Sequence, residues 1–527
     1  MSIGYIITMV FGAVVLLGIC IFVHELGHLL GGKMVGIKAR VFSMGYGKGI
    51  LKKQIGDTTY QVTLIPFGGY CQFYGDEPGE ERKGEPWEFF SAPPLKRIVP
   101  VVMGPLFNLF LGILIFFAMN LVGYERESSR VLLADEFAVE AQGQEKYVAP
   151  ARKAGIRTGD RIARINDAPV NQFTDIQKSI FFADGSPVRV WADRDGTMME
   201  FTVTPEQSEK GRFTIGVMPY ISGVRVMKTM PGSAAAAAGL LPGDMIRRVD
   251  GKTVRIPDDF TSHVKERQGK RIAVEVERGG ETVRLEAVPG LREVITVQPV
   301  ENARLKGKDT TITIEGDGIE KIRKGIAAGQ VKINDRPVAD YAAFLERVRD
   351  TRGDVLTITN GAESVHGIFS YRSYGFLGVE TGIVQDMVLV RYGLGESFVR
   401  AFTEPYDFIV MNLKGLGMLF SGQLNVRQNL SGPIFIAKIA GDVAYYRGVS
   451  SFIILMAQIS IILMIMNLLP IPMVDGSYIV IFLIEAIRKK PLSNKVMERI
   501  QYFGMALLIL LGVFIIFNDI MKIFFTQ

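Results

Sequence analysis

One segment of the sequence has the residue types and spacing to hold a metal ion for hydrolysis, His24-Glu25-Leu26-Gly27-His28. Residues four positions apart lie on the same face of a helix, so the two imidazoles can bind one metal ion together. Glu25 lies beside them and can reach a water molecule at that ion. The chain has only four histidines, so this pattern rarely arises by chance. The segment predicts a zinc site in which Glu25 moves protons.

The position of this motif favours a functional site over a packing histidine beside a surface glutamate. No Asp, Glu, Lys, Arg or His occurs from Ser2 to Val23, and a helix of that length crosses a bilayer. Ionisable side chains at membrane depth are costly and are found mainly where they serve a site. The run lacks the basic start of a signal peptide and contains the motif itself, so we expect a retained transmembrane helix.

A carboxylate at the end of another apolar run can complete the metal site. Gly448 to Val474 is uncharged and is followed by Asp475, which can supply the third protein ligand that two imidazoles lack. The alternative role of Asp475 is a helix-ending turn with the next glycine. Pro470 and Pro472 interrupt helical hydrogen bonding and predict local unwinding beside the metal.

Four uncharged runs predict four transmembrane helices, and the charges of the loops predict their direction. Ten Lys or Arg residues lie from Lys33 to Arg97, and a second basic loop contains Arg488-Lys489-Lys490. The positive-inside rule places both loops in the cytoplasm and both termini outside. The first and third runs then both travel inward, which brings Asp475 to the same side of the membrane as the two histidines.

The first basic loop is predicted to contain a membrane-associated β-hairpin. Thr58 to Ile65 alternates as a strand, which Pro66-Phe67-Gly68-Gly69-Tyr70 is expected to end. A strand edge beside the metal could receive an unwound peptide through main-chain hydrogen bonds. An ordinary surface hairpin is the alternative interpretation of this pattern.

The segment from Glu125 to Arg447 has the composition of soluble domains and contains an internal repeat. Gly159-Asp160 is echoed by Gly243-Asp244, and a third copy that lacks this pair continues to Asn334-Asp335. A Gly-Asp turn before a buried strand resembles bacterial PDZ domains, which bind extended peptides or chain termini by strand addition. Ile215-Gly216-Val217 and Phe376-Leu377-Gly378-Val379 are candidate carboxylate-binding loops or ordinary strand ends. The domains could bind peptides or act as a size filter over the membrane site.

The composition favours a protein that is part membrane and part soluble, because 48% of its 527 residues are hydrophobic. The net charge of +6 is small, and no basic block interleaved with aromatic residues occurs, so we expect no nucleic-acid partner. Cys20 and Cys71 give no disulfide framework, which is compatible with a bacterial envelope protein. Asp407 and Lys414 interrupt the apolar residues from Tyr392 to Gln428, which favours an amphipathic surface helix over a fifth crossing.

The motifs of this chain, in their order around PDZ-like domains, resemble those of the bacterial site-two proteases and especially the regulator-of-sigma-E protease group. They are His24 to His28, Pro66 to Tyr70, Gly104-Pro105 with Asn108, Asn429-Leu430-Ser431-Gly432-Pro433, and Asn467 to Gly476. The resemblance implies an intramembrane zinc endopeptidase of the bacterial cytoplasmic (inner) membrane. Its implied substrates are single-span membrane proteins, such as anti-sigma factors already trimmed outside, and remnant signal peptides.

The resemblance also implies roles for individual residues. His24, His28 and Asp475 would bind zinc, and Glu25 would handle protons. Asn467 would contact the substrate backbone, and the hairpin at Gly68, Gly69 and Tyr70 would clamp the substrate. The chain departs from the family in having Val474-Asp475-Gly476-Ser477 where Leu-Asp-Gly-Gly is usual, and in having a third PDZ-like segment beyond the expected pair.

The predicted fold class is an α-helical polytopic membrane protein with four transmembrane helices, a membrane-associated β-hairpin and inserted α+β PDZ-like periplasmic domains. The predicted segments are transmembrane helix 1 (1–36), the hairpin loop (37–96), transmembrane helix 2 (97–124), three PDZ-like domains (125–220, 221–292 and 293–385), an amphipathic membrane-surface segment (386–447), transmembrane helix 3 (448–484), a cytoplasmic loop (485–499) and transmembrane helix 4 (500–524).

Two other functions fit parts of the pattern. A non-catalytic membrane receptor or chaperone could use the PDZ-like domains to bind envelope peptides, and it would bind no metal and tolerate changes at Glu25 and Asp475. A transporter that uses membrane His and Asp residues as relay groups is disfavoured, because only four crossings are predicted and they contain no repeat.

Overall fold

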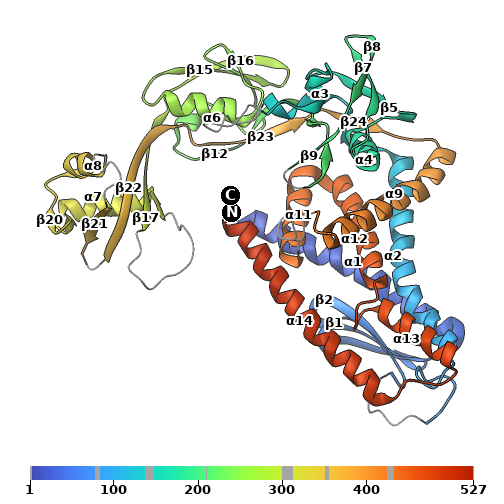
Figure 1. Cartoon of the computed structure of the whole chain (residues 1–527). Coiled ribbons are helices and arrows are strands. Elements are labelled where there is room, and N and C mark those ends of the chain that lie inside the picture. The colour runs from blue at the N-terminus through green and yellow to red at the C-terminus, as the bar shows by residue number, and fades with distance from the viewer. Residues whose placement is uncertain are drawn as a thin grey trace. The chain divides into compact units, whose positions relative to one another are not determined.

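The computed structural model describes residues 3–76, 83–136, 147–208, 211–299, 312–349, 355–361, 363–423 and 432–525. The chain folds into two compact units (Figure 1). Unit 1 comprises Met1–Met218 and Met387–Gln527, and unit 2 comprises Pro219–Asp386. Unit 1 contains the long apolar helices, whereas unit 2 consists of strands and short helices.

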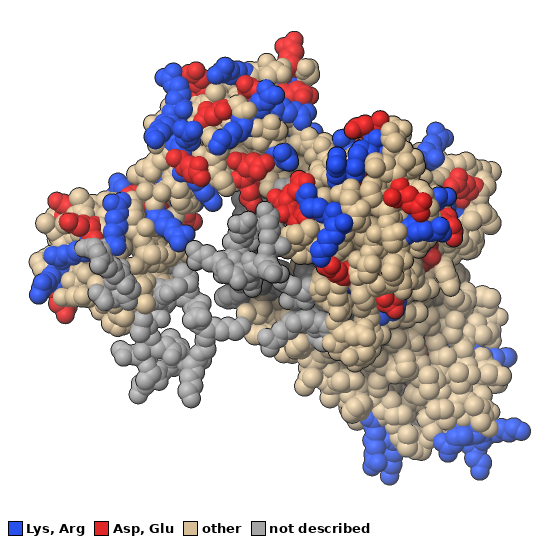
Figure 2. All heavy atoms as spheres, turned by 45° about the horizontal axis from the view of Figure 1, so that its top comes forward, with Lys and Arg blue, Asp and Glu red and all other residues tan. Residues whose placement is uncertain are grey.

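Four helical spans of the described chain are long and apolar enough to cross a membrane, which agrees with the predicted number. The candidate spans are Ile6–Val35, Pro94–Val122, Pro433–Leu468 and Lys495–Asp519. They lie in α1 (Ile3–Val35), in α2 (Pro94–Val122), in α11 (Pro433–Asp442) with η2 (Val443–Arg447) and α12 (Gly448–Leu468), and in α14 (Asn494–Phe525). The helical part of unit 1 presents an almost uncharged surface in Figure 2, with Lys and Arg beyond one end.

The third apolar span differs from the predicted helix 448–484. Its helical stretch begins at Pro433, inside the predicted surface segment. The charged residues Lys438 and Asp442 fit into this stretch because they pair with each other at 3.3 Å, one helical turn apart. It ends at Leu468, and α13 (Asp475–Arg488) begins after a non-helical stretch. The two prolines therefore interrupt the helix as predicted. The preceding motif at 429–431 lies outside the described residues.

The first two apolar helices approach each other closely because glycines face the partner helix. A Cβ atom at Gly27 would lie 2.2 Å from the backbone oxygen of Met103. A Cβ atom at Gly104 would lie 2.4 Å from the imidazole of His28. Backbone of α2 thus reaches the motif on α1. Further out, Leu16 and Cys20 of α1 pack with Phe116 of α2 and Ala457 and Ile461 of α12 in one buried cluster.

The predicted hairpin is present, but its second strand is longer than predicted. β1 (Ala39–Ile55) and β2 (Thr58–Phe73) form an antiparallel sheet that packs against α1. Residues 42–44 of β1 pair with Tyr60–Val62 on one side and with Gly69–Cys71 on the other. The prediction that 66–70 ends the strand is therefore wrong. The strand continues because these residues pair with the opposite edge of β1.

The chain leaves the apolar helices after α2 and returns to them at α9, and the two connecting strands lie side by side. β3 (Tyr124–Glu127), directly after α2, pairs with β24 (Met387–Val390), which precedes α9 (Leu394–Phe420). α9 packs against α2 and α12. The predicted amphipathic segment is thus a long helix on the membrane bundle.

A buried salt bridge of 2.8 Å joins Arg97 of α2 to Glu485 of α13 at the other end of the bundle.

The first repeat domain belongs to unit 1 and folds around one hydrophobic core, which includes Ile162, Ile176 and Val190. Its main four-stranded sheet has the order β6-β5-β7-β8, and β11 pairs with β4. The elements are β4 (Val131–Leu133), η1 (Ala134–Glu136), α3 (Pro150–Lys153), β5 (Arg161–Ile165), β6 (Ala168–Pro169), α4 (Phe173–Ala183), β7 (Val188–Arg194), β8 (Thr197–Val203), β9 (Glu206–Gln207), β10 (Phe213–Thr214) and β11 (Val217–Pro219).

The second repeat domain contains a strand that the sequence assigned to the third domain. Its sheet has the order β16-β15-β13-β12-β23, with β14 on β13. β23 pairs with β12 from Ile221 to Thr229, so it cannot belong to a separate domain 293–385. The elements are β12 (Ile221–Thr229), α5 (Ala234–Ala237), β13 (Met245–Val249), β14 (Lys252–Thr253), α6 (Pro257–Glu266), β15 (Ile272–Arg278), β16 (Glu281–Ala287) and β23 (Val379–Gln385).

The third repeat domain is inserted into the second, between β16 and β23. It has its own core and a sheet of order β18-β17-β22-β21-β19-β20. Gly290 of β17 pairs with Phe376 of β22, so both ends of the insertion meet. The elements are β17 (Gly290–Pro299), β18 (Ile312–Glu315), α7 (Asp317–Ala327), β19 (Val331–Ile333), β20 (Arg336–Pro337), α8 (Tyr341–Arg349), β21 (Val355–Asn360) and β22 (Glu363–Phe376).

The predicted repeat is visible in matching turns of all three domains. Asn166, Asp250 and Asn334 each have a positive φ, of 50°, 46° and 49°. Their side chains accept hydrogen bonds from the backbone of Arg189, Ala273 and Thr357, respectively. The first and second domains also share a buried carboxylate, Asp160 and Asp244, each held by an arginine, Arg194 and Arg278. Burial would raise the pKa of Asp244, but hydrogen bonds from Arg278 and the Leu241 backbone outweigh it and lower that pKa below its ordinary value.

Candidate metal centre

Two segments far apart in the sequence supply the candidate ligands. α1 presents His24 and His28 on one face, one helical turn apart. The break between α12 and α13 places Asp475 at the first residue of α13. The carboxylate therefore lies at a helix amino terminus, where a negative charge is favoured.

The three side chains converge on a small volume. The Nε2 atoms of His24 and His28 lie 3.1 Å apart. Oδ2 of Asp475 lies 3.2 Å from Nε2 of His24, and Oδ1 lies 3.7 Å from Nε2 of His28. The structure thus brings together the predicted pair of imidazoles and the predicted carboxylate.

This donor set fits a zinc ion. Zinc bonds of about 2.0–2.1 Å at a tetrahedral angle hold neighbouring ligand atoms about 3.3 Å apart, which is close to the separations in this cluster. Among the described residues, no hydrogen-bond donor satisfies the buried Oδ2 atom of Asp475. A buried carboxylate oxygen without a donor is costly, and a bound cation would satisfy it. Two nitrogens and one oxygen are also the ligand types that catalytic zinc sites use.

The far side of each imidazole contacts α2. Nδ1 of His28 lies 2.8 Å from the backbone oxygen of Pro100. Nδ1 of His24 lies 3.3 Å from the side-chain amide of Asn108. His24 is 8% exposed and Asn108 is fully buried. The second apolar helix therefore fixes both rings from behind, while their Nε2 atoms face Asp475.

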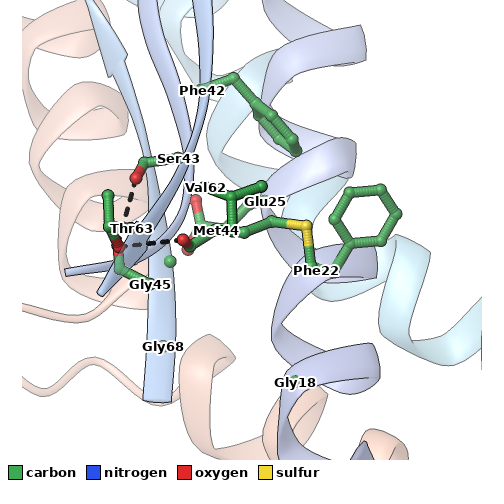
Figure 3. Close-up of a pocket in the computed structure, with 11 residues that line it drawn as sticks. Gly18, Phe22, Glu25, Phe42, Ser43, Met44, Gly45, Val62, Thr63 and Gly68 are labelled. Atoms are coloured by element: carbon green, nitrogen blue, oxygen red, sulfur yellow. Dashed lines mark hydrogen bonds between the residues drawn. The ribbon is translucent and has the colours of Figure 1, made fainter. Parts of the chain in front are cut away.

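A carboxylate oxygen of Glu25 and ligand nitrogens of His24 and His28 lie within 4.8 Å of one another. Glu25 also lines a pocket between α1 and the hairpin (Figure 3). The pocket is open and has a cavity volume of about 80 Å³. Its wall on α1 is formed by Gly18, Phe22 and Glu25, which repeat at helical spacing on one face. The hairpin forms the other wall with Phe42, Ser43, Met44, Gly45, Val62, Thr63, Gly68 and Gly69. Glu25 and a largely apolar pocket therefore share one opening beside the candidate ligands.

The structure also places the predicted substrate-binding residues near this pocket. The side-chain amide of Asn467 lies 3.2 Å from Nε2 of His24. Gly68 and Gly69 line the pocket, and the backbone oxygen of Gly69 accepts a hydrogen bond from the hydroxyl of Tyr46. Tyr70 stacks on Tyr46. Asn467 therefore lies on α12 beside a candidate ligand, and Gly68, Gly69 and Tyr70 lie on β2, which forms part of the pocket wall.

Sequence reasoning gave no role to the residues that hold the ligands in place. The sequence pattern includes Asn108 as part of a motif without a role, and it does not single out Ser460, which donates to the backbone oxygen of Asn108 at 2.9 Å. A polar side chain inside an apolar run was the signal that could have singled out each of them. Arg97 and Glu485 were also missed, because their pairing joins two helices that are distant in the sequence.

Comparisons with known proteins agree on one family. The model of the family described as "Peptidase family M50" matches residues 12–511 of this chain. A protein of Treponema pallidum named "Putative zinc metalloprotease" is 25% identical over 97% of this chain and 98% of its own length. The "Regulator of sigma-E protease RseP" of Escherichia coli is 26% identical over 97% of this chain and 98% of its own length. The "Regulator of sigma E protease" of Haemophilus influenzae is also 26% identical with the same coverage.

Proposed function

The chain belongs to peptidase family M50, the site-2 protease family, and we propose that it cuts single-span membrane proteins within the bilayer. It is a zinc metalloendopeptidase, so the alternative function of a non-catalytic receptor is wrong. The observation that carries the proposal is the convergence of His24, His28 and Asp475 beside Glu25. Two relatives are named as regulators of sigma E, which supports a role in sigma-factor regulation. The proposed substrates are anti-sigma-factor-like proteins that are cut outside first, and remnant signal peptides.

In the proposed mechanism, His24, His28 and Asp475 would hold the zinc ion. Zinc supplies Lewis acidity, which polarises the scissile carbonyl and makes water a better nucleophile. Glu25 accepts the proton of the attacking water and returns it to the leaving amine, so one carboxylate serves as base and then as acid. The Asn467 amide donates a hydrogen bond to the oxygen that gains negative charge.

The hairpin can hold an unwound segment of the substrate in position for cleavage. A helical substrate keeps its carbonyls in its own hydrogen bonds, so it must unwind before attack. An extended segment can add to the sheet beside Gly68, Gly69 and Tyr70, where main-chain hydrogen bonds replace those of the lost helix. Helix-weak residues near the cut should therefore favour cleavage.

The outer domains have a proposed role in substrate access. We infer that the repeat domains are PDZ-like, because the loops Ile215–Gly216 and Leu377–Gly378 repeat one hydrogen-bond pattern. Ala151 donates to the backbone oxygen of Ile215, as Ala235 does to that of Leu377. β23 is an edge strand that packs beside α6, a geometry suited to peptide addition. The domains either bind trimmed chain ends in this way or exclude bulky untrimmed proteins.

The proposed location is the bacterial inner membrane. The four apolar spans agree with a multi-pass protein. The basic loops at 33–97 and 488–490 support a cytoplasmic side next to the zinc site, with both termini and the repeat domains outside.

Replacing Glu25 with Gln tests the proposed chemistry. The amide keeps the size of the side chain but cannot accept a proton, so we expect cleavage of a model single-span substrate to fall at least about 10²–10⁴-fold. Zinc content, measured by metal analysis of the purified protein, should remain equal to that of the unsubstituted enzyme.

The exposed Glu498 offers a matched control for this change. Glu498→Gln makes the same chemical substitution on α14, and the variant should cleave the substrate at the normal rate. Full activity of Glu25→Gln would refute the mechanism. Normal zinc content in a variant with Asp475→Ala would refute the proposed ligand set.

A further inference from the structure

The imidazole of His24 makes two sets of contacts on opposite edges. Its Nε2 atom faces His28, Asp475 and the metal position. Its Nδ1 atom faces the amide of Asn108 on α2, at 3.3 Å. Both Asn108 and Ser460 of α12 are fully buried, so protein groups must satisfy this side of the ring.

Metal binding determines which ring nitrogen carries the proton. A neutral imidazole has one N–H group, and a metal ligand must keep the lone pair of the coordinating nitrogen free. Since Nε2 faces the metal position, the proton must lie on Nδ1. That N–H then needs an acceptor, and the only polar side chain recorded against it among the described residues is the amide of Asn108.

The contacts of Ser460 select one of the two amide orientations. A half-turn of the Asn108 side chain exchanges its amide oxygen and nitrogen. With the nitrogen towards His24, the amide would donate to Nδ1 and place the imidazole proton on Nε2, against the metal. With the oxygen towards His24, it accepts from Nδ1, and the amide nitrogen takes the position 3.3 Å from Oγ of Ser460. That Oγ can accept, because its own proton goes to the backbone oxygen of Asn108 at 2.9 Å.

We propose that Asn108 is a positioning residue that accepts the Nδ1 proton of His24 through its amide oxygen, with Ser460 holding the amide in this orientation. The network keeps Nε2 of His24 free to bind zinc and fixes the ring plane from α2 and α12. In it, the Nδ1 proton of His24, the hydroxyl proton of Ser460 and one amide proton of Asn108 each have an acceptor. The inference rests on the proposed ligand set and adds a reason for polar residues inside two apolar helices.

Zinc affinity of the purified full-length protein tests the proposal. Asn108→Leu removes the acceptor, and loss of such a partner typically weakens metal binding about 10–100-fold. Asn108→Asp places an acceptor of the same shape at Nδ1, so this variant should hold zinc at least as tightly as the unsubstituted protein. Retained zinc is measured after equilibration with a series of competing chelator concentrations.

Ser460→Ala tests the second member of the network, and Ser397→Ala is its matched control. Both serines are fully buried, but Ser397 lies on α9 and donates to the backbone oxygen of Tyr392, away from the ligands. Ser460→Ala should weaken zinc binding, by less than Asn108→Leu does, and Ser397→Ala should leave it unchanged. Excess zinc should also restore substrate cleavage to Asn108→Leu, which it would not do if the variant were misfolded.

Two results would overturn the inference. The first is zinc affinity of Asn108→Leu equal to that of the unsubstituted protein. The second is loss of zinc in Asn108→Asp as large as in Asn108→Leu, which would show that Nδ1 needs a donor. His24→Ala and Asp475→Ala, measured in parallel, separate this failure from failure of the proposed function. If those two variants keep zinc, the ligand set itself is wrong.

Discussion

Gly27 lies between the two histidines of α1 and directly against the backbone of α2. Its Cβ position is 2.2 Å from the backbone oxygen of Met103, so a methyl group there cannot be accommodated by turning a side chain. The helices would have to separate, and His28 would lose its 2.8 Å contact with the backbone oxygen of Pro100. The glycine in the motif therefore belongs to the packing that positions the ligands.

Gly27→Ala should consequently weaken both zinc binding and stability. Forcing extra atoms into a packed core typically costs about 1–3 kcal/mol, and we expect a lower melting temperature in detergent together with faster loss of zinc to a chelator. Gly4→Ala is the control on the same helix, because a Cβ atom there meets nothing within 4 Å. Equal behaviour of the two variants would show that close contact of α1 with α2 does not hold the site.

At the scale of elements, α13 connects the candidate ligand to the rest of the bundle. Asp475 is its first residue, and Glu485 further along pairs with Arg97 at 2.8 Å. The guanidinium of Arg97 also lies 4.6 Å from the ring centre of Phe482 and donates to the backbone oxygen of Ala92. A helix that follows a proline-rich break has no preceding helical hydrogen bonds to orient it, so these buried contacts fix its direction.

The pocket beside Glu25 is an element-scale property, because α1 and the hairpin each form one wall. Gly18 lines this pocket, and a Cβ atom at that position meets nothing within 4 Å. A larger side chain can therefore fill the pocket without disturbing the packing of α1. The apolar lining from Phe22, Met44 and Val62 suits an apolar substrate side chain next to the cut.

Gly18→Leu should shift the substrate preference towards small residues. Loss of room for a few carbon atoms typically changes discrimination about 10–200-fold, so cleavage of a substrate with Leu or Phe at the pocket position should fall by that range. A substrate with Ala at the same position should be cleaved at close to the normal rate, which is measured on paired model substrates. A uniform loss on both substrates would count against a side-chain pocket at this position.

At the scale of the whole molecule, the repeat domains are not arranged one after another along the chain. The third domain occupies the interval between β16 and β23 of the second. Gly290 and Phe376 are antiparallel partners where the insertion begins and ends. A Cβ atom at Gly375 would lie 2.1 Å from the backbone oxygen of Val264, so the end of β22 packs tightly on α6. The second domain therefore remains closed at the point of insertion.

Removing residues 291–375 and joining the ends with an Asn-Gly turn should leave the second domain folded. A two-residue turn of this type connects adjacent antiparallel strands without strain. Removing 293–385 instead, as the predicted boundary suggests, deletes β23 and the buried Leu377 from the second core. Limited proteolysis of the two purified full-length variants should show protection of residues 219–289 in the first deletion and cleavage in the second. Equal protection in both would contradict the assignment of β23.

The sequence by itself determined the family, the number of apolar spans and the residue types at the candidate zinc site. These features are local, because each of them is defined by residues that are neighbours in the sequence. They are an uncharged run, two histidines one helical turn apart, and a carboxylate after Pro470 and Pro472. The repeat at Asn166, Asp250 and Asn334 was also visible, because each copy carries its own turn chemistry.

Only the tertiary structure decided which of these local pieces meet. The alternation of Val379–Gln385 predicts a strand, but nothing in it says that the strand pairs with β12 rather than with the nearer strands of the third domain. The hydrogen bond from Ser460 to Asn108 crosses between two apolar helices whose hydrophobicity alone allows many rotations. Pairing partners and helix rotation depend on which distant surfaces are buried together, and no short stretch of sequence records that choice.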